Sequence, residues 1–193
     1  KNCSNTSISV TPTDQDFHKC WITLEDDFSF NKEENKQRIF FYGNSYNEQL
    51  APIPAAIVKK RNDLQFNSFF TNTGCIPSEI ITPKNNRNIE CKLTFKNYLN
   101  FFDNYSKEGD LFIISSSFNP FPSEKKNSYL KNNSEISNRD ALNIYLEELR
   151  ALHIRLKNKG KGLVVVSPIP IIQNNPRLCA HWFAKTNNLC NSN

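Results

Sequence analysis

Hydrophobic residues in this chain gather into short runs that alternate with longer stretches compatible with helices. Four segments rich in aliphatic and aromatic residues, each followed by turn-forming residues, predict buried strands; they lie at 38–42, 64–70, 111–114 and 163–166. The stretches between them predict helices at about 47–61, 93–105 and 140–159. Because strands alternate with helices and are apolar on both sides, we expect an α/β protein with a parallel sheet covered on both faces.

The first 37 residues differ from the rest of the chain because they are polar and lack a strong period. We expect residues 1–37 to form an arm that lies on the domain and is pinned by Cys3 and Cys20. Residues 38–193 are expected to form the α/β domain itself, since a chain of 193 residues is long enough for one domain with a substantial core.

Six cysteines suggest disulfides rather than a metal site. No pair has C-x-x-C spacing and only three His accompany them, which argues against zinc. An even number of Cys favours an oxidising compartment, and among the many possible connectivities we favour the local one, which closes short loops. It pairs Cys3 with Cys20, Cys75 with Cys91, and Cys179 with Cys190. The alternative is six free thiols in a cytoplasmic protein.

Charge and hydropathy exclude some classes of function. The net charge of +5 is mild, and no basic stripe is interleaved with aromatics, so nucleic acid is a poor candidate partner. No apolar run is long enough to span a membrane. Lys1 is not an initiator Met and no signal peptide follows it. We therefore expect the chain to be a piece of a longer protein, with any export signal outside it.

A candidate nucleophile follows the first predicted strand. The strand stops at Gly43, and Ser45 comes just before the predicted helix. A strand, a tight turn and a helix lift a hydroxyl to the carboxyl edge of a sheet, where backbone N–H groups can face an anion. Acyl transfer needs such a place for a serine. The alternative is an ordinary turn in which Ser45 caps the helix.

Polar turn residues follow three of the predicted strands. Ligands bind beyond the carboxyl ends of parallel strands, so these segments are expected to meet at one edge. They are Gly43-Asn44-Ser45, Thr73-Gly74-Cys75 and Ser117-Phe118-Asn119. Turn formation alone could also explain such residues.

Further motifs appear in a fixed order along the chain. They are Gly43-Asn44-Ser45-Tyr46 after a strand, Gly74 before Cys75-Ile76-Pro77, Cys91, Asp110 at the start of the third strand, Asn119, and Cys179, Trp182-Phe183 and Cys190 in the tail. In order and spacing this set resembles the SGNH (GDSL-like) hydrolase superfamily. The closest resemblance is to the extracytoplasmic SGNH domain fused to bacterial membrane acyltransferases that O-acetylate surface polysaccharides.

The resemblance implies a fold and a mechanism. The fold would be a three-layer α/β/α arrangement with a parallel, flavodoxin-like sheet whose C-terminal part is truncated here. Ser45 would attack an acyl carbonyl, and the N–H groups of Ser45 and Gly74 with the side chain of Asn119 would hold the oxyanion. The acyl group would pass to a sugar hydroxyl or to water, without a cofactor or metal.

The resemblance also implies a location and partners. The domain would lie on the extracytoplasmic, periplasmic side, tethered through a membrane acyltransferase domain in the same full-length chain. Its partners would be an acyl donor and a surface polysaccharide or another sugar acceptor.

The chain departs from the family pattern in two ways. Asn44 stands in place of the usual Asp, and Tyr46 in place of the usual His. No Asp-x-x-His, which carries the family's general base, follows the last predicted strand, and we interpret the late His181 as structural. The base is therefore expected beyond Asn193. The alternative function is a degenerate, non-catalytic module that binds glycan or caps its membrane partner.

Overall fold

A mixed β-sheet forms the centre of the molecule. The computed structural model describes residues 11–22, 36–44, 50–71, 75–84, 88–115 and 129–166, leaving aside the side chains of 88–90. The sheet has the order β1-β3-β2-β5-β8, with strands β1 (Trp21–Ile22), β2 (Gln37–Gly43), β3 (Leu64–Phe70), β5 (Leu111–Ser115) and β8 (Gly162–Val166). The last four are parallel, and β1 pairs antiparallel with β3. The order of the parallel strands is that of a flavodoxin-like sheet.

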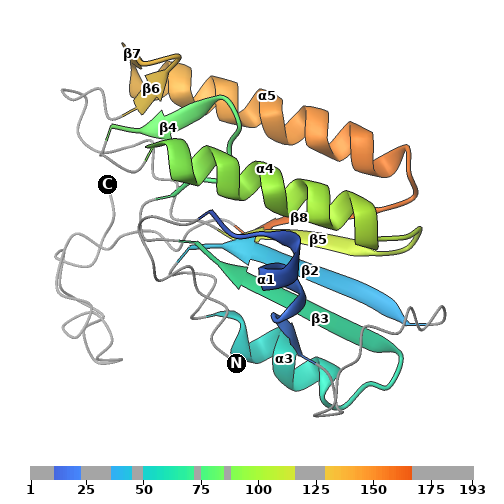
Figure 1. Ribbon diagram of the computed structural model, residues 1–193. Coiled ribbons are helices and arrows are strands. Elements are labelled where there is room, and N and C mark those ends of the chain that lie inside the picture. Colours follow the sequence, from blue (N-terminus) through green and yellow to red (C-terminus); the bar gives the residue numbers. More distant parts are fainter. Residues whose placement is uncertain are drawn as a thin grey trace, which may run out of the picture.

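Helices cover both faces of the sheet (Figure 1). The long helices α4 (Asn88–Tyr105) and α5 (Asn138–Lys157) lie on one face, and α3 (Pro52–Val58) lies on the other. The short helix α1 (Asp14–His18) packs against α4 and β3. The expected three-layer α/β/α fold is therefore confirmed. None of the helices in the described part of the chain combines the length and apolar character needed to cross a membrane.

Successive residues of β2 face opposite layers, as the pleat requires. Phe40 and Tyr42 belong to the core under α4, whereas Phe41 packs in a smaller core with Val58 of α3. The ring centroids of Phe40 and Phe102 are 4.9 Å apart with planes at 89°. Such aromatic pairs stabilise a core by about 0.5–1.5 kcal/mol beyond the area that they bury.

The predicted strands and long helices match the structure with modest shifts of their ends. The helix expected at 47–61 is shorter at its end, because α3 stops at Val58; residues 45–49 lie outside the described part. It begins with Pro52, whose missing N–H costs nothing in a first helical turn. In the other direction, α4 starts five residues before the expected position 93, at Asn88.

A second, three-stranded antiparallel sheet was not predicted. It consists of β4 (Ile81–Pro83), β6 (Tyr129–Lys131) and β7 (Ser134–Ile136) in the order β4-β6-β7. Asn132 and Asn133, at φ 49° and 65°, form the two-residue turn between β6 and β7. Both residues adopt the left-handed conformation that Asn tolerates and that a tight hairpin requires. Strands of three residues are too short to show a period in the sequence.

Part of the predicted N-terminal arm contributes to the core. Phe17 of α1 is fully buried, and its ring centroid lies 4.7 Å from that of Phe69. Strand β1 extends the sheet by pairing with β3. The boundary between arm and domain at residue 37 stays a prediction.

Candidate active site

Three parallel strands end side by side at one edge of the sheet. In the register, Gly43 at the end of β2 pairs with Phe70 of β3 on one side and with Ser115 of β5 on the other. The three predicted site residues Ser45, Gly74 and Asn119 follow these strand ends in the sequence but lie outside the described residues. Their meeting at this edge therefore stays a prediction, while the strands that lead to them are neighbours.

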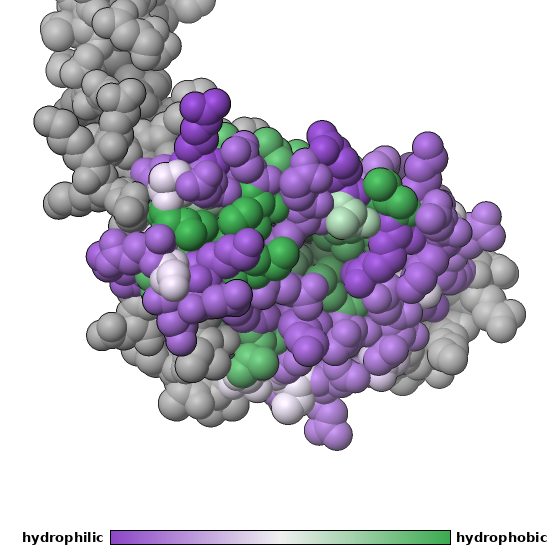
Figure 2. Space-filling model, turned by 90° about the horizontal axis from the view of Figure 1, so that it is seen from above, coloured by the Kyte–Doolittle hydropathy of each residue, from purple (hydrophilic) through white to green (hydrophobic). Residues whose placement is uncertain are grey.

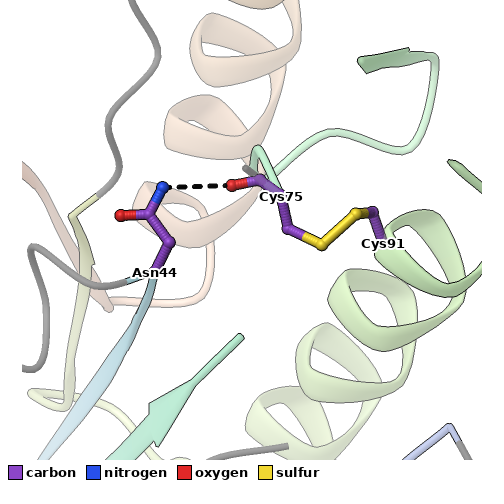
Figure 3. Close-up of a disulfide and its surroundings, with 3 residues drawn as sticks. All are labelled: Asn44, Cys75 and Cys91. Atoms are coloured by element: carbon purple, nitrogen blue, oxygen red, sulfur yellow. Dashed lines mark hydrogen bonds between the residues drawn. A yellow bond between two sulfur atoms is a disulfide. The ribbon is translucent and has the colours of Figure 1, made fainter. Parts of the chain in front are cut away.

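Asn44, the residue before Ser45, is fully buried and links two of the strand ends. Its backbone N–H donates to the carbonyl of Ser115 at 3.3 Å. Its side-chain Nδ2 donates to the carbonyl of Cys75 at 3.3 Å, as Figure 3 shows. The residue that precedes the candidate nucleophile is thereby bonded to the residue that follows Gly74.

This hydrogen bond requires an amide at position 44. The Asp that is usual there in the SGNH superfamily, which the sequence resembles, could not make it when ionised. An ionised carboxylate has no hydrogen to donate, so it cannot make this bond to a carbonyl oxygen. Asn44 can, and burial makes an unmatched polar group costly. The sequence identified Asn44 only as a departure from a pattern; its role depends on Cys75, 31 residues away.

The segment after Gly74 is covalently fastened to α4. Cys75 and Cys91 form a disulfide with their Cα atoms 5.3 Å apart, which confirms the predicted pairing of these two residues (Figure 3). Cys3, Cys179 and Cys190 lie outside the described residues, so the pairings 3–20 and 179–190 stay predictions. Cys20 is buried, with its Sγ 3.5 Å from the carbonyl oxygen of Asp16.

A buried hydroxyl lies at the same edge. Ser115 is 1% exposed, and its Oγ has no hydrogen-bond partner within the described part of the chain, although its carbonyl accepts from Asn44. Leaving a buried hydroxyl unmatched costs about 1–3 kcal/mol. Among the described residues, the end of β5 thus carries a buried hydroxyl without a matched partner next to Gly43.

Neither described histidine is placed to act as a base at this edge. The ring of His18 contacts the ring of Tyr105 at 4.4 Å, and the Tyr105 carbonyl accepts from Arg38 near the start of β2. His18 is therefore at the opposite end of the sheet, and burial lowers its pKa. His153 is exposed near the end of α5, and His181 lies outside the described residues.

Metal ligands do not gather in the part of the chain that the structure describes: no three His, Cys, Asp or Glu side chains there could hold an ion together.

Comparison with known proteins gives one result. The family model described as "SGNH domain (fused to AT3 domains)" matches residues 3–193. No curated protein and no solved structure gives a match to this chain.

Proposed function

Because the chain belongs to the family of SGNH domains that are fused to AT3 acyltransferase domains, we propose that it transfers acyl groups with Ser45 as the nucleophile. Ser45 gives up its proton and attacks the carbonyl of an acyl donor. The bond between the acyl carbon and the donor's leaving group breaks, the leaving group departs with a proton, and an acyl-enzyme remains. The acyl group then passes to a sugar hydroxyl of a cell-surface polysaccharide or to water. The ester bond to Ser45 breaks as the new bond forms.

The observation that carries this proposal is the hydrogen bond between Asn44 and the carbonyl of Cys75. It ties the chain just before Ser45 to the chain just after Gly74. An oxyanion hole needs its donors held at a fixed distance from the nucleophile before the reaction starts. In the proposal the N–H groups of Ser45 and Gly74 and the side chain of Asn119 are those donors.

The general base is a histidine in the family resemblance. No Asp-x-x-His follows β8 in the 193 residues. His18 and His153 do not lie at this edge of the sheet. Neither of these two histidines is therefore assigned the proton of Ser45.

The cellular setting is part of the proposal. The disulfide between Cys75 and Cys91 is typical of proteins outside the reducing cytoplasm. We place the domain on the extracytoplasmic side of a membrane, next to the membrane acyltransferase domain with which its family is fused. A surface polysaccharide is then within reach as acceptor.

The test is Ser45→Ala in the full chain. We expect the rate of hydrolysis of a small acetyl ester to fall by about a thousandfold. The acetyl content of the cell-surface polysaccharide should fall to background. Ser134→Ala, at an exposed position in β7, is the matched control and should keep wild-type activity. Undiminished activity in Ser45→Ala would rule out Ser45 as the nucleophile.

A second candidate function is a non-catalytic module that binds glycan. Tyr46, which stands in place of the usual His, and the lack of an Asp-x-x-His after β8 in the 193 residues favour it. A full chain that binds acetylated glycan but shows no activity dependent on Ser45 toward esters or glycans would make this function the better one.

A further inference from the structure

The segment that follows Gly74 is held from α5 by one carboxylate. We call residues 75–80 the anchor loop. One oxygen of Glu148, Oε1, accepts from the N–H groups of Glu79 at 2.9 Å and Ile80 at 3.1 Å. The hydroxyl of Ser78 donates to the other oxygen, Oε2. Three donors of the anchor loop therefore converge on a residue that is about 70 positions away in the sequence.

The Ser78 hydroxyl passes this restraint on to the start of β4. Ser78 is 1% exposed, and its Oγ also accepts from the N–H groups of Ile80 at 3.1 Å and Ile81 at 2.9 Å. The Glu148 carboxylate and the Ser78 hydroxyl thus form one network across the end of the anchor loop. Because the Glu148 carboxyl group accepts three hydrogen bonds from this segment, it is the main support of the network.

Glu148 differs from its neighbour on the same helix. It is half-buried, and burial raises its pKa even though three hydrogen bonds act in the opposite direction. Glu147 is exposed and pairs with Arg150, also exposed, at 2.6 Å. A carboxylate is costly to bury, so its place at the anchor loop depends on the donors that meet it there.

The last residues of the anchor loop border a cavity, whereas its first residues are packed. Ile76 is buried and packs in a core with Ile81 and Tyr145. Pro77, Glu79 and Ile80 border an open cavity of about 270 Å³ between the loop, α4 and α5, and Glu148 lines it too. Figure 2, which shows the molecule from above the view of Figure 1, has apolar side chains and a hollow between hydrophilic ones. Hydrogen bonds to Glu148 therefore restrain Glu79 and Ile80, the two exposed residues of the loop, where they border the cavity.

The inner side of the loop leads directly to the candidate active site. The loop begins at Cys75, which is bonded to Asn44 through its carbonyl and to Cys91 through its sulfur. Its first residue follows Gly74, whose N–H is one of the proposed oxyanion donors. The anchor loop is thus held from β2, α4 and α5 at once.

We propose that Glu148 is a positioning residue that fixes the anchor loop and thereby the Gly74 N–H at the distance required by the oxyanion. This inference rests on the proposed function. Glu148 touches no substrate. Its loss should loosen a transition-state contact and leave ground-state binding nearly unchanged, so kcat should fall while KM stays similar.

The test compares Glu148→Ala, Glu148→Gln and Glu147→Ala in the full chain, with hydrolysis of a small acetyl ester as the assay. We expect Glu148→Ala to lower kcat by about 10- to 100-fold and to change KM by less than about threefold. Gln keeps an oxygen for the N–H groups of Glu79 and Ile80, so it should recover most of the kcat. Glu147→Ala should behave as wild type.

Amide hydrogen exchange gives a second readout that does not depend on activity. Exchange in residues 75–84 should become faster in Glu148→Ala, whereas exchange in β5 should not change. Wild-type kcat in the folded Glu148→Ala protein, or unchanged exchange in the anchor loop, would overturn the inference.

Ser45→Ala separates this result from a failure of the proposed function. If the wild-type chain shows no activity that depends on Ser45, the proposed function fails, and the catalytic role of Glu148 fails with it. If the activity that depends on Ser45 is present and Glu148→Ala keeps the wild-type kcat, the positioning role of Glu148 is wrong and the proposed function stands.

Discussion

Single buried polar residues connect the layers of this protein. Asn67 in the middle of β3 is fully buried. Its Oδ1 accepts from the Tyr98 hydroxyl at 2.6 Å, and its Nδ2 donates to the Phe17 carbonyl at 2.9 Å. One amide thus joins the sheet to α4 and to α1.

Replacing Asn67 with Leu should destabilise the fold by about 3 kcal/mol. The substitution keeps the approximate size but removes the acceptor of one buried group and the donor to another, at about 1–3 kcal/mol each. The free energy of unfolding in urea measures the effect. Asn143→Leu, at an exposed position in α5, is the control and should change stability by less than about 0.5 kcal/mol. A wild-type midpoint for Asn67→Leu would contradict this role.

Among the elements, α4 has a special position because it contacts both the core and the candidate active site. Its apolar side chains Phe95, Tyr98 and Phe102 pack in the main core. Its first turns carry Cys91, which holds the segment after Gly74. A helix fixed by the core therefore provides a rigid support for the loop at the carboxyl edge.

Removing the disulfide between α4 and this loop should cost about 3 kcal/mol. The two cysteines are 16 positions apart, and cross-linking a loop of about that length reduces the entropy of the unfolded chain by about that amount. Thermal unfolding of the Cys75→Ala/Cys91→Ala variant measures the loss. A non-reduced digest of the same protein should show that its other cysteines are linked as in the wild type. An unchanged melting temperature would mean that other contacts hold the loop.

The pH dependence of stability is a property of the whole molecule, and two carboxyl groups shape it in the same direction. Burial raises the pKa of Asp110 above 3.8 and that of Glu148 above 4.5, although backbone N–H groups act against the shift in both cases. A carboxyl group with a raised pKa in the folded state binds its proton more tightly there than in the unfolded chain. Its contribution to stability is greatest at low pH and is lost as pH rises through the folded pKa.

Asp110→Asn should reveal the contribution of Asp110. Asp110 accepts from the N–H of Arg38 at 2.8 Å and from that of Lys107 at 2.7 Å, and an amide can accept only one of these bonds. We expect the variant to be less stable than wild type. The difference in the free energy of unfolding should be larger near pH 3.5 than near pH 7, because ionisation of Asp110 destabilises the wild-type protein. Urea unfolding at both pH values is the measurement, and a difference that grows with pH would contradict the sign.

The sequence by itself determined the order of the main elements. The strands at 38–42, 64–70, 111–114 and 163–166 correspond to β2, β3, β5 and β8, and the best periodic stretch corresponds to α5. These signals are local, since a strand buried on both faces must be apolar along its length and an amphipathic helix repeats every three or four residues. Short spacing also favoured the pairing of Cys75 with Cys91, which the structure confirms.

Only the tertiary structure decided which distant residues meet. Phe17 reads as part of a polar arm, yet it lies in the main core. In the sequence, Asn44 is only a departure from a motif and Glu148 is one polar residue of a helix. In the structure, Asn44 donates to the carbonyl of Cys75, and Glu148 accepts from donors of residues 78–80. A hydrogen bond depends on a geometry of a few ångströms between groups that the sequence separates by 31 to 70 positions, and no local pattern encodes that distance.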